Sequence, residues 1–347
     1  MVFTYFIGNG FDLNIGLQTS YDHFLDYYLK DVKEKPEDDA PVIDRLKYYI
    51  KDSRKKDIIN WSNAEMAFGD ATVFFKDSDD YESDFILCKD DFCSALCDYL
   101  KMQNKRLSNI ALSEKQKSKV SVAIGDIIGG LKTDSFRTIS KAIRNENIEI
   151  NIVSFNYTDS IDSLTKDIRN VKNVVNINGI NHNIFYKKMI HVHGTFDRDM
   201  VFGVHDDSQV AFPEMFENND ILRAQIIKEE INHGHENGVE EDVKRIVESS
   251  DIIYIYGMSL GETDNRWWQR IMEMMRSKKN AQLIVYDYET PEISISAYTY
   301  QKNRQIIRSK LLSFCDQATE TEKNELASRI YLDPHDKFDM LANIVPK

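Results

Sequence analysis

The stretch YFIGNGFDLNIGLQTSY, residues 5–21, sets the first question about this chain. Its apolar, strand-like start runs directly into Gly8-Asn9-Gly10, and Asp12 follows. Glycines after a first strand allow a tight turn and let backbone N–H groups face an anion, which indicates a phosphate-bearing ligand. The third glycine of the dinucleotide-binding spacing is missing, and a structural turn between a strand and a helix gives the same pattern.

Composition limits the classes of protein that fit. The 347 residues, 42% of them apolar, are enough for one α/β domain with a large insertion or for two domains. Acidic residues outnumber basic ones, 57 to 44, and the net charge of -13 argues against a broad nucleic-acid-binding surface. We therefore expect a small-molecule nucleotide as the partner and no extended nucleic-acid surface.

The sequence carries no signal for a membrane or for secretion. No apolar run approaches the roughly 20 residues of a membrane span, and no basic segment precedes an apolar run at the N-terminus. Cys88, Cys93, Cys97 and Cys315 form no C-x-x-C pair, so a zinc ribbon is not expected. These features predict a reduced, cytoplasmic protein without a membrane partner and without a metal.

The order of apolar runs predicts an α/β fold. Strands alternate with helical segments, which is typical of a mostly parallel sheet with helices on both faces. Between the first two strands, apolar residues recur at helical spacing. We expect a core of residues 1–20 and 146–295, a helical insertion or lid of residues 21–145, and a helical C-terminal segment of residues 296–347. The six expected strands are Val2–Ile7, Ile148–Phe155, Val174–Ile177, Met189–Val192, Ile252–Tyr256 and Gln282–Tyr286.

Small polar clusters follow four of the expected strands. In open parallel sheets ligands bind outside the carboxyl ends of the strands, so the four clusters together predict a binding site. Each also has a simpler interpretation: Asn156 is a common turn residue, and His191 and His193, two apart on a strand, resemble metal ligands without a third partner at a suitable spacing. The clusters are Gly8–Asp12, Ser154–Asp159, His191–Phe196 and Gly257–Asp264.

One cluster supports a different class of enzyme. The segment GMSLG, residues 257–261, matches the G-x-S-x-G turn of α/β-hydrolases, which presents a serine nucleophile. Asp287 and His335 follow Ser259 in the chain order of that family. A serine hydrolase would leave the other polar clusters without roles, and His335 lies in the acidic segment LDPHDKFD. A serine hydrolase stays as the alternative.

Several motifs resemble known families. IGNGFDLNIGLQTSYDHFL, SFNYTDSID, HVHGTF, VFGVHDD and YGMSLGETD resemble the AbiH family of bacterial abortive-infection, antiphage proteins, from the N-terminus to about residue 290. The same motifs are similar, more distantly, to the sirtuin-like NAD-binding fold. Asp12 stands where the sirtuin pattern has serine, and Thr158 stands where it has aspartate. The matching positions are Gly8, Gly10, Gly16, Leu17, Ser154, Asn156, His193, Gly194, Gly257, Ser259 and Leu260.

The resemblance implies a Rossmann-like, sirtuin-like sheet and an NAD-consuming reaction. Because the four-cysteine zinc module of the deacetylases is absent, it implies hydrolysis of NAD to nicotinamide and ADP-ribose, with NAD as substrate. Asn156 would position water and a ribose hydroxyl, His193 would act as general base, and Asp12 would bind the carboxamide or stabilise positive charge. The nucleotide-binding residues would be Gly8, Asn9, Gly10, Gly257, Ser259, Asp264 and Asp287.

A module that senses a nucleotide without turning it over is the second alternative. The sequence leaves open whether the chain forms a homo-oligomer and whether a phage-derived trigger activates it.

Overall fold

The computed structural model describes residues 1–32, 34–37, 39–56, 63–143, 147–169, 173–290, 297–315 and 317–346. The chain divides into two units. We call Met1–Leu17, Leu107–Val192 and Val239–Lys347 the sheet unit, and Gln18–Arg106 with His193–Gly238 the helical unit. No helix in the described ranges combines the length and apolar character that crossing a membrane requires.

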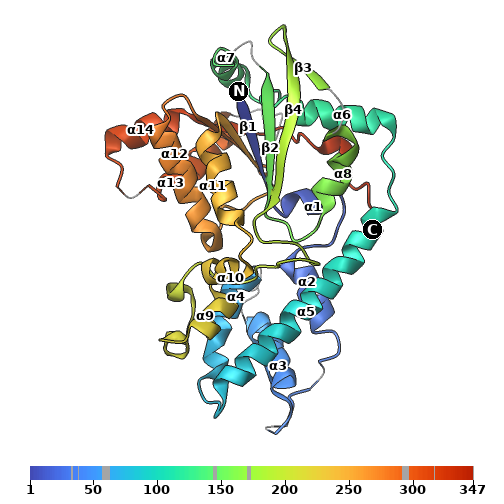
Figure 1. Ribbon diagram of the computed structural model, residues 1–347, viewed down its shortest axis with the longest axis vertical. Helices are drawn as coiled ribbons and strands as arrows, with labels where there is room; N and C mark the ends of the chain where they lie inside the picture. Colours follow the sequence, from blue (N-terminus) through green and yellow to red (C-terminus); the bar gives the residue numbers. More distant parts are fainter. Residues whose placement is uncertain are drawn as a thin grey trace. The chain divides into compact units, whose positions relative to one another are not determined.

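A mostly parallel sheet runs through the sheet unit (Figure 1). Within the described residues it has seven strands in the order β3-β4-β2-β1-β5-β6-β7, and only the β3–β4 pair is antiparallel. The chain therefore starts in the middle of the sheet, builds outward on one side, and returns to the other side of β1. The strands are β1 (Val2–Ile7), β2 (Ile148–Ser154), β3 (Asn173–Ile177), β4 (Ile180–His191), β5 (Ile252–Tyr256), β6 (Gln282–Tyr286) and β7 (Ile330–Asp333).

Helices cover both faces of this sheet, because alternate side chains of the strands are apolar on each side. On β1, Tyr5 and Ile7 belong to one buried cluster, whereas Phe6 belongs to the other. Trp268 anchors the second cluster and stacks on Phe155, just beyond β2. The first face carries α1 (Gly10–Asn14), α6 (Glu114–Gly125), α7 (Thr133–Ser140) and α8 (Ser160–Arg169), and the second carries α11 (Val239–Ser249) and α12 (Asn265–Ser277).

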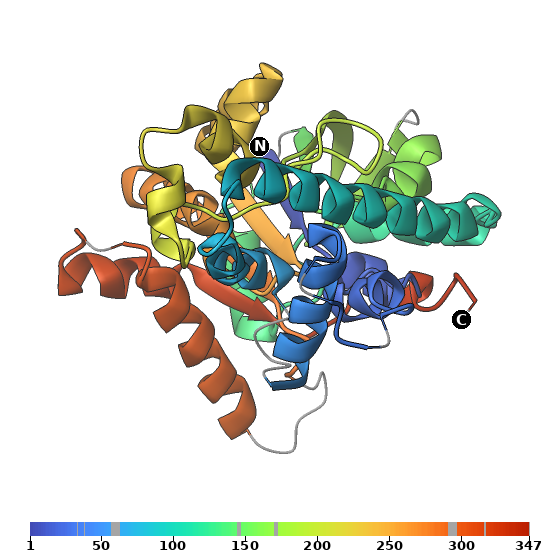
Figure 2. The same cartoon turned by 90° about the horizontal axis from the view of Figure 1, so that it is seen from below.

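The C-terminal part of the chain closes the β7 edge of the sheet. Helices α13 (Ala297–Leu312) and α14 (Glu320–Ser328) both contact β7 (Figure 2). The chain then continues to α1, where the Val345 amide donates to the Ile15 carbonyl at 2.9 Å. The end of the chain therefore supports the short helix that carries Asp12.

The helical unit has an aromatic core of its own. Phe68 and Phe92 pack on each other and on Phe202, which comes from the chain after β4. The buried ammonium of Lys89 donates to the Phe202 carbonyl at 2.6 Å. The helices of this unit are α2 (Tyr21–Tyr28), α3 (Val42–Lys56), α4 (Ala64–Asp70), α5 (Tyr81–Ser108), α9 (Asp220–Ile226) and α10 (Lys228–His235).

The sequence-based expectation of an α/β fold with a mostly parallel sheet is confirmed, with two differences in the strands. The expected strand Met189–Val192 is the end of a longer strand that starts at Ile180, where it forms a hairpin with β3. The expected helical C-terminal segment contains β7, which pairs with β6. A four-residue strand between helical segments offers too short an apolar run for sequence patterns to separate from a helix.

The two units also differ in extent from the insertion expected at residues 21–145. Helices α6 and α7 belong to the sheet unit, because Val120, Ile124 and Ile139 enter its core cluster. Residues 193–238 belong instead to the helical unit. Sequence periodicity identifies helices but does not show which core each helix joins.

Two glycine turns contact each other backbone to backbone beside β1. The Gly8 amide donates to the Tyr256 carbonyl at 2.9 Å, and the Gly10 amide donates to the Gly257 carbonyl at 2.8 Å. A Cβ atom on Gly10 would lie 2.5 Å from the Gly257 Cα, and Gly257 itself has a φ of +66°. Glycine is therefore needed at both positions for the turn after β1 to meet the turn after β5.

We expect Gly10→Ala to lower the free energy of unfolding by about 1–3 kcal/mol, because the added methyl forces the two turns apart. Urea denaturation of the purified variant measures the change. Gly261→Ala is the control in the same region, since its Cβ would make only an ordinary contact of 3.4 Å with the Ser259 hydroxyl. Equal stabilities for the two variants would contradict the close-contact explanation.

Candidate functional site

Asp12 is a buried carboxylate just beyond the carboxyl end of β1. It lies in α1 and is 1% exposed. The Thr158 hydroxyl donates to it at 2.6 Å, and the Ser160 hydroxyl donates to its other oxygen. Burial raises the pKa of Asp12 to about 6, and these hydrogen bonds and the nearby Asn156 amide hold it below the value that burial alone would give. Near neutral pH the site therefore contains a desolvated carboxylate that titrates.

Asn156 lies next to this carboxylate, just beyond the end of β2. Asn156 is 4% exposed, and its main-chain N–H donates to the Ser154 hydroxyl at 3.2 Å. Its side-chain amide makes no hydrogen bond to any residue that the structure describes. Buried polar groups are almost always hydrogen-bonded, so an unpartnered amide beside a carboxylate indicates a place for a ligand or water.

His191 ends β4 and contacts the same loop. Its Nε2 lies 2.6 Å from the Asp162 carboxylate, and its Nδ1 lies 3.1 Å from the Asn156 carbonyl oxygen. Burial lowers the pKa of His191, but the hydrogen bond and charge of Asp162 outweigh it, and the net result is a raised pKa. With both ring nitrogens engaged, His191 presents no open nitrogen to the metal considered from the sequence.

His193 belongs to the helical unit, outside β4. The strand alternation expected to align His191 with His193 therefore ends at His191. His193 is buried, and its carbonyl accepts the Val201 amide at 2.9 Å. Gly194 has a φ of +63°, and a Cβ there would lie 2.0 Å from the Asp199 carbonyl oxygen. The His-Gly pair thus forms a tight turn, and the catalytic role of His193 stays a prediction.

A pocket of about 640 Å³ opens at the carboxyl ends of β1, β5 and β6, wholly within the sheet unit. Four of the expected nucleotide-binding residues line it: Gly10, Gly257, Ser259 and Asp287. The amides of Gly8 and Gly10 already donate to carbonyls, as described above, so the backbone groups expected to face a phosphate are engaged elsewhere. Gly8, Asn9 and Asp264 are not among the described residues that line the pocket.

The charge of the pocket favours an uncharged or cationic group. Asp287, Glu289 and Asp336 supply three carboxylates to its lining. The ammonium of Lys310 is the cation of the described lining, and it donates to the Ser259 carbonyl at 2.9 Å. The remaining wall is largely apolar and includes Met258, Val285, Tyr286, Tyr288 and Ile306.

Asp287 has less freedom to bind a ligand than the sequence suggested. It is 7% exposed and accepts hydrogen bonds from the Glu289 amide at 3.2 Å, from the Asn303 side chain at 3.0 Å, and from the Thr290 hydroxyl. These contacts fix the turn after β6. The Asp287 carboxylate oxygens are therefore engaged within the chain.

The geometry around Ser259 differs from a nucleophile turn. In that turn the serine occupies a strained backbone position, but here the positive φ values fall on Gly257 and Leu260. Ser259 lines the large pocket, whereas His335 lines a separate hollow with Gly129 and Gly130. The structure thus does not assemble Ser259 and His335 into the triad considered from the sequence.

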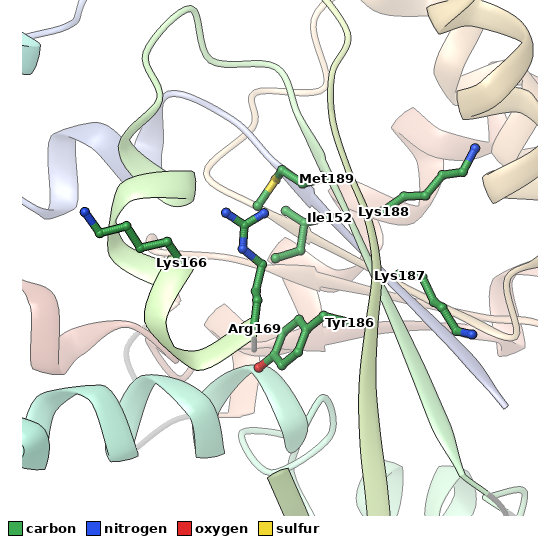
Figure 3. Close-up of a pocket in the computed structure, with 7 residues that line it drawn as sticks. All are labelled: Ile152, Lys166, Arg169, Tyr186, Lys187, Lys188 and Met189. Carbon is green, nitrogen blue, oxygen red and sulfur yellow. The ribbon is translucent and has the colours of Figure 1, made fainter. Parts of the chain in front are cut away.

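A second hollow, of about 320 Å³, lies beside α8 and β4 (Figure 3). Its lining is basic, but Arg169, Lys187 and Lys188 each contact a carboxylate: Asp162, Glu149 and Asp242 respectively. Lys187 and Lys188 also extend from the opposite side of β4 to Arg169 (Figure 3). The basic residues of this hollow therefore do not converge on one anion.

The described residues that sequence reasoning missed are His191, Thr158, Ser160 and Asp162. The HVH motif drew attention to His191 only as a metal ligand, and Asp162 lies beyond the polar clusters identified from the sequence. Their roles depend on contacts between residues far apart in the sequence, such as the one joining Thr158 to Asp12.

The sequence profile described as "Bacteriophage abortive infection AbiH" matches residues 4–287. No curated protein matches the chain at a significant level. The matched region includes β1 to β6 and the polar loops at their carboxyl ends.

We expect Asp12→Asn to stabilise the protein at about pH 7.5. The folded pKa of about 6 exceeds the ordinary 3.8, so the wild type loses stability as the pH rises from about 4 to above 6, by about 3 kcal/mol in total. An amide cannot ionise and avoids this loss. Urea denaturation of both proteins at about pH 4 and pH 7.5 measures it; a difference that does not grow with pH would contradict the assignment.

Proposed function

We propose that this chain, which belongs to the AbiH family of proteins of abortive infection by bacteriophage, acts in abortive infection by hydrolysing NAD⁺. The observation that carries the proposal is the buried, unpartnered amide of Asn156 beside the buried carboxylate of Asp12. Gly10, two residues before Asp12 in the same short helix, lines the large pocket. Helix α1 thus carries both Asp12, one member of the proposed reactive pair, and Gly10, which lines the pocket.

The chemistry of NAD⁺ cleavage suits this pair. Water replaces nicotinamide at the anomeric carbon of its ribose, which gives nicotinamide, ADP-ribose and one proton. As nicotinamide leaves, the sugar acquires oxocarbenium character, as in glycoside hydrolysis. The Asp12 carboxylate would stabilise that positive charge in a water-poor site, and the Asn156 amide would orient the attacking water and a ribose hydroxyl.

The pocket would hold the adenosine part of the substrate. Its apolar wall fits a purine ring, and its three carboxylates, Asp287, Glu289 and Asp336, disfavour phosphate groups inside it. The chain returns to the other side of β1 at β5, and this reversal of the strand order supports a nucleotide site there, because open parallel sheets bind ligands at such points. Gly8 and Gly10 would contribute by permitting the close turn contact, and we do not assign the pyrophosphate to their engaged amides.

Two departures from the sirtuin pattern fall on side chains that meet in this structure. The sequence has Asp12 where that pattern has serine, and Thr158 where it has aspartate. These two side chains hydrogen-bond to each other at 2.6 Å. A carboxylate that accepts a hydroxyl hydrogen bond therefore lies beside Asn156, which supports the role proposed for Asp12. The general-base role of His193, which lies in the helical unit, stays part of the proposal on sequence grounds alone.

We expect Asn156→Ala to reduce NAD⁺ hydrolysis by a factor of about 10²–10⁴, because the amide that orients water is lost. Release of nicotinamide from purified protein, followed by chromatography, measures the rate, and a thermal melt of the same sample checks the fold. Asn181→Ala, at an exposed asparagine of the β3–β4 hairpin, is the matched control and should retain the wild-type rate.

Turnover that survives Asn156→Ala would exclude the proposed site. Wild-type protein that binds NAD⁺ without consuming it would favour the nucleotide-sensing alternative.

A further inference from the structure

Both ring nitrogens of His191 face oxygen atoms that accept hydrogen bonds. Nδ1 lies 3.1 Å from the main-chain carbonyl oxygen of Asn156, and Nε2 lies 2.6 Å from the carboxylate of Asp162. A carbonyl and an ionised carboxylate cannot donate, so the ring satisfies both contacts only when both nitrogens carry protons. The second oxygen of Asp162 lies 3.5 Å from the Arg169 guanidinium, which favours the ionised carboxylate.

The surroundings of His191 are acidic. Its side chain is 13% exposed, and it faces Asp162 of α8, Asp159 before that helix, and Asp12 of α1. Burial lowers the pKa of His191, but Asp162, the Asn156 carbonyl and Asp159 together raise it above the ordinary value. In turn, the positive charge of His191 lowers the pKa of Asp12.

The orientation of Asn156 depends on its main chain. By distance and angle its side-chain amide makes no hydrogen bond to a described residue, and the group that interacts with it is the nearby Asp12 carboxylate. Its main-chain N–H contacts Ser154, and its carbonyl contacts His191. These two contacts set the direction in which the side chain leaves the backbone.

We propose that His191 is a positioning residue, whose imidazolium fixes the Asn156 carbonyl and so holds the Asn156 amide beside Asp12. The expected effect on turnover rests on the proposed NAD⁺ hydrolysis, whereas the expected orientation of the Asn156 amide does not. His191 does not line the large pocket in which we place the adenosine, so its loss should lower kcat with little effect on KM.

Two near-isosteric substitutions separate the two hydrogen bonds. His191→Asn places an amide nitrogen close to the Nδ1 position and keeps the bond to Asn156, whereas His191→Gln places it close to Nε2 and keeps the bond to Asp162. We expect kcat to fall about 100-fold in His191→Gln and His191→Ala, with KM within about threefold, because a displaced catalytic group costs a factor of this size. His191→Asn should stay within about tenfold of the wild type.

His182→Asn is the control, since His182 is a buried histidine of the same strand that lines a different hollow, and its kcat should match the wild type. An Asn variant as slow as the Ala variant, or a loss confined to KM, would overturn the positioning role.

The pH dependence supplies a readout that a purely structural role would not move. Turnover should fall as the pH rises through the raised pKa of His191, because the neutral ring keeps the proton on Nε2, facing the Asp162 carboxylate, and loses the Nδ1 proton that the Asn156 carbonyl requires. Asp162→Asn removes the carboxylate that raises this pKa, so the fall should move to lower pH. A pH profile that Asp162→Asn leaves unchanged would contradict the inference.

Nuclear magnetic resonance tests the same arrangement without any turnover. In ¹⁵N-histidine-labelled protein at about pH 7, His191 should show two protonated ring nitrogens. The Asn156 side-chain amide signals should be sharp in the wild type and broadened in His191→Ala. A neutral His191 ring, or unchanged Asn156 signals, would overturn the positioning role even if the protein hydrolyses NAD⁺. If the wild type leaves NAD⁺ intact while both signals behave as expected, the proposed hydrolysis fails and the positioning role stands.

Discussion

The site depends on the backbone contact between the turn after β1 and the turn after β5. Gly10 and Gly257 approach so closely that neither position has room for a Cβ atom. This contact fixes the start of α1, and α1 contributes both Gly10 to the pocket wall and Asp12 to the buried polar cluster. The glycines that suggested a phosphate-binding loop have a structural role as well: they join two loops, so that pocket and carboxylate share one support.

Burial of Asp12 is the main energetic cost of this arrangement. Transfer of a carboxylate out of water raises its pKa to about 6, and the Thr158 and Ser160 hydroxyls offset only part of that cost. Proteins retain such groups where an ionised carboxylate in a water-poor site has a chemical use. Around it lie the buried Asn156 amide and the His191 imidazole, whose pKa is raised above its ordinary value by the Asp162 carboxylate. The carboxylate, amide and imidazole all come from the carboxyl ends of neighbouring strands.

The fold was predictable from the sequence to the extent that buried parallel strands have a distinctive composition. The runs that became β1, β2, β5 and β6 were found almost to the residue, because each is a short apolar segment bounded by polar turns. The full length of β4 and the four-residue β7 were not found, because the β3–β4 hairpin and the pairing of β7 with β6 depend on contacts between strands that a local sequence pattern does not contain. The polar loops at the strand ends were also predictable. The contacts within them were not, because Asp12 and Thr158 lie 146 residues apart, and no local pattern shows that a hydroxyl will meet a carboxylate.

The most direct test of the account is the fate of NAD⁺ with the purified protein in oxygen-18-labelled water. The account predicts nicotinamide and ADP-ribose in equal amounts, with one labelled oxygen at the anomeric carbon of ADP-ribose, because water attacks that carbon. Unchanged NAD⁺, or a cyclised product without label, would contradict hydrolysis at the Asp12 and Asn156 site.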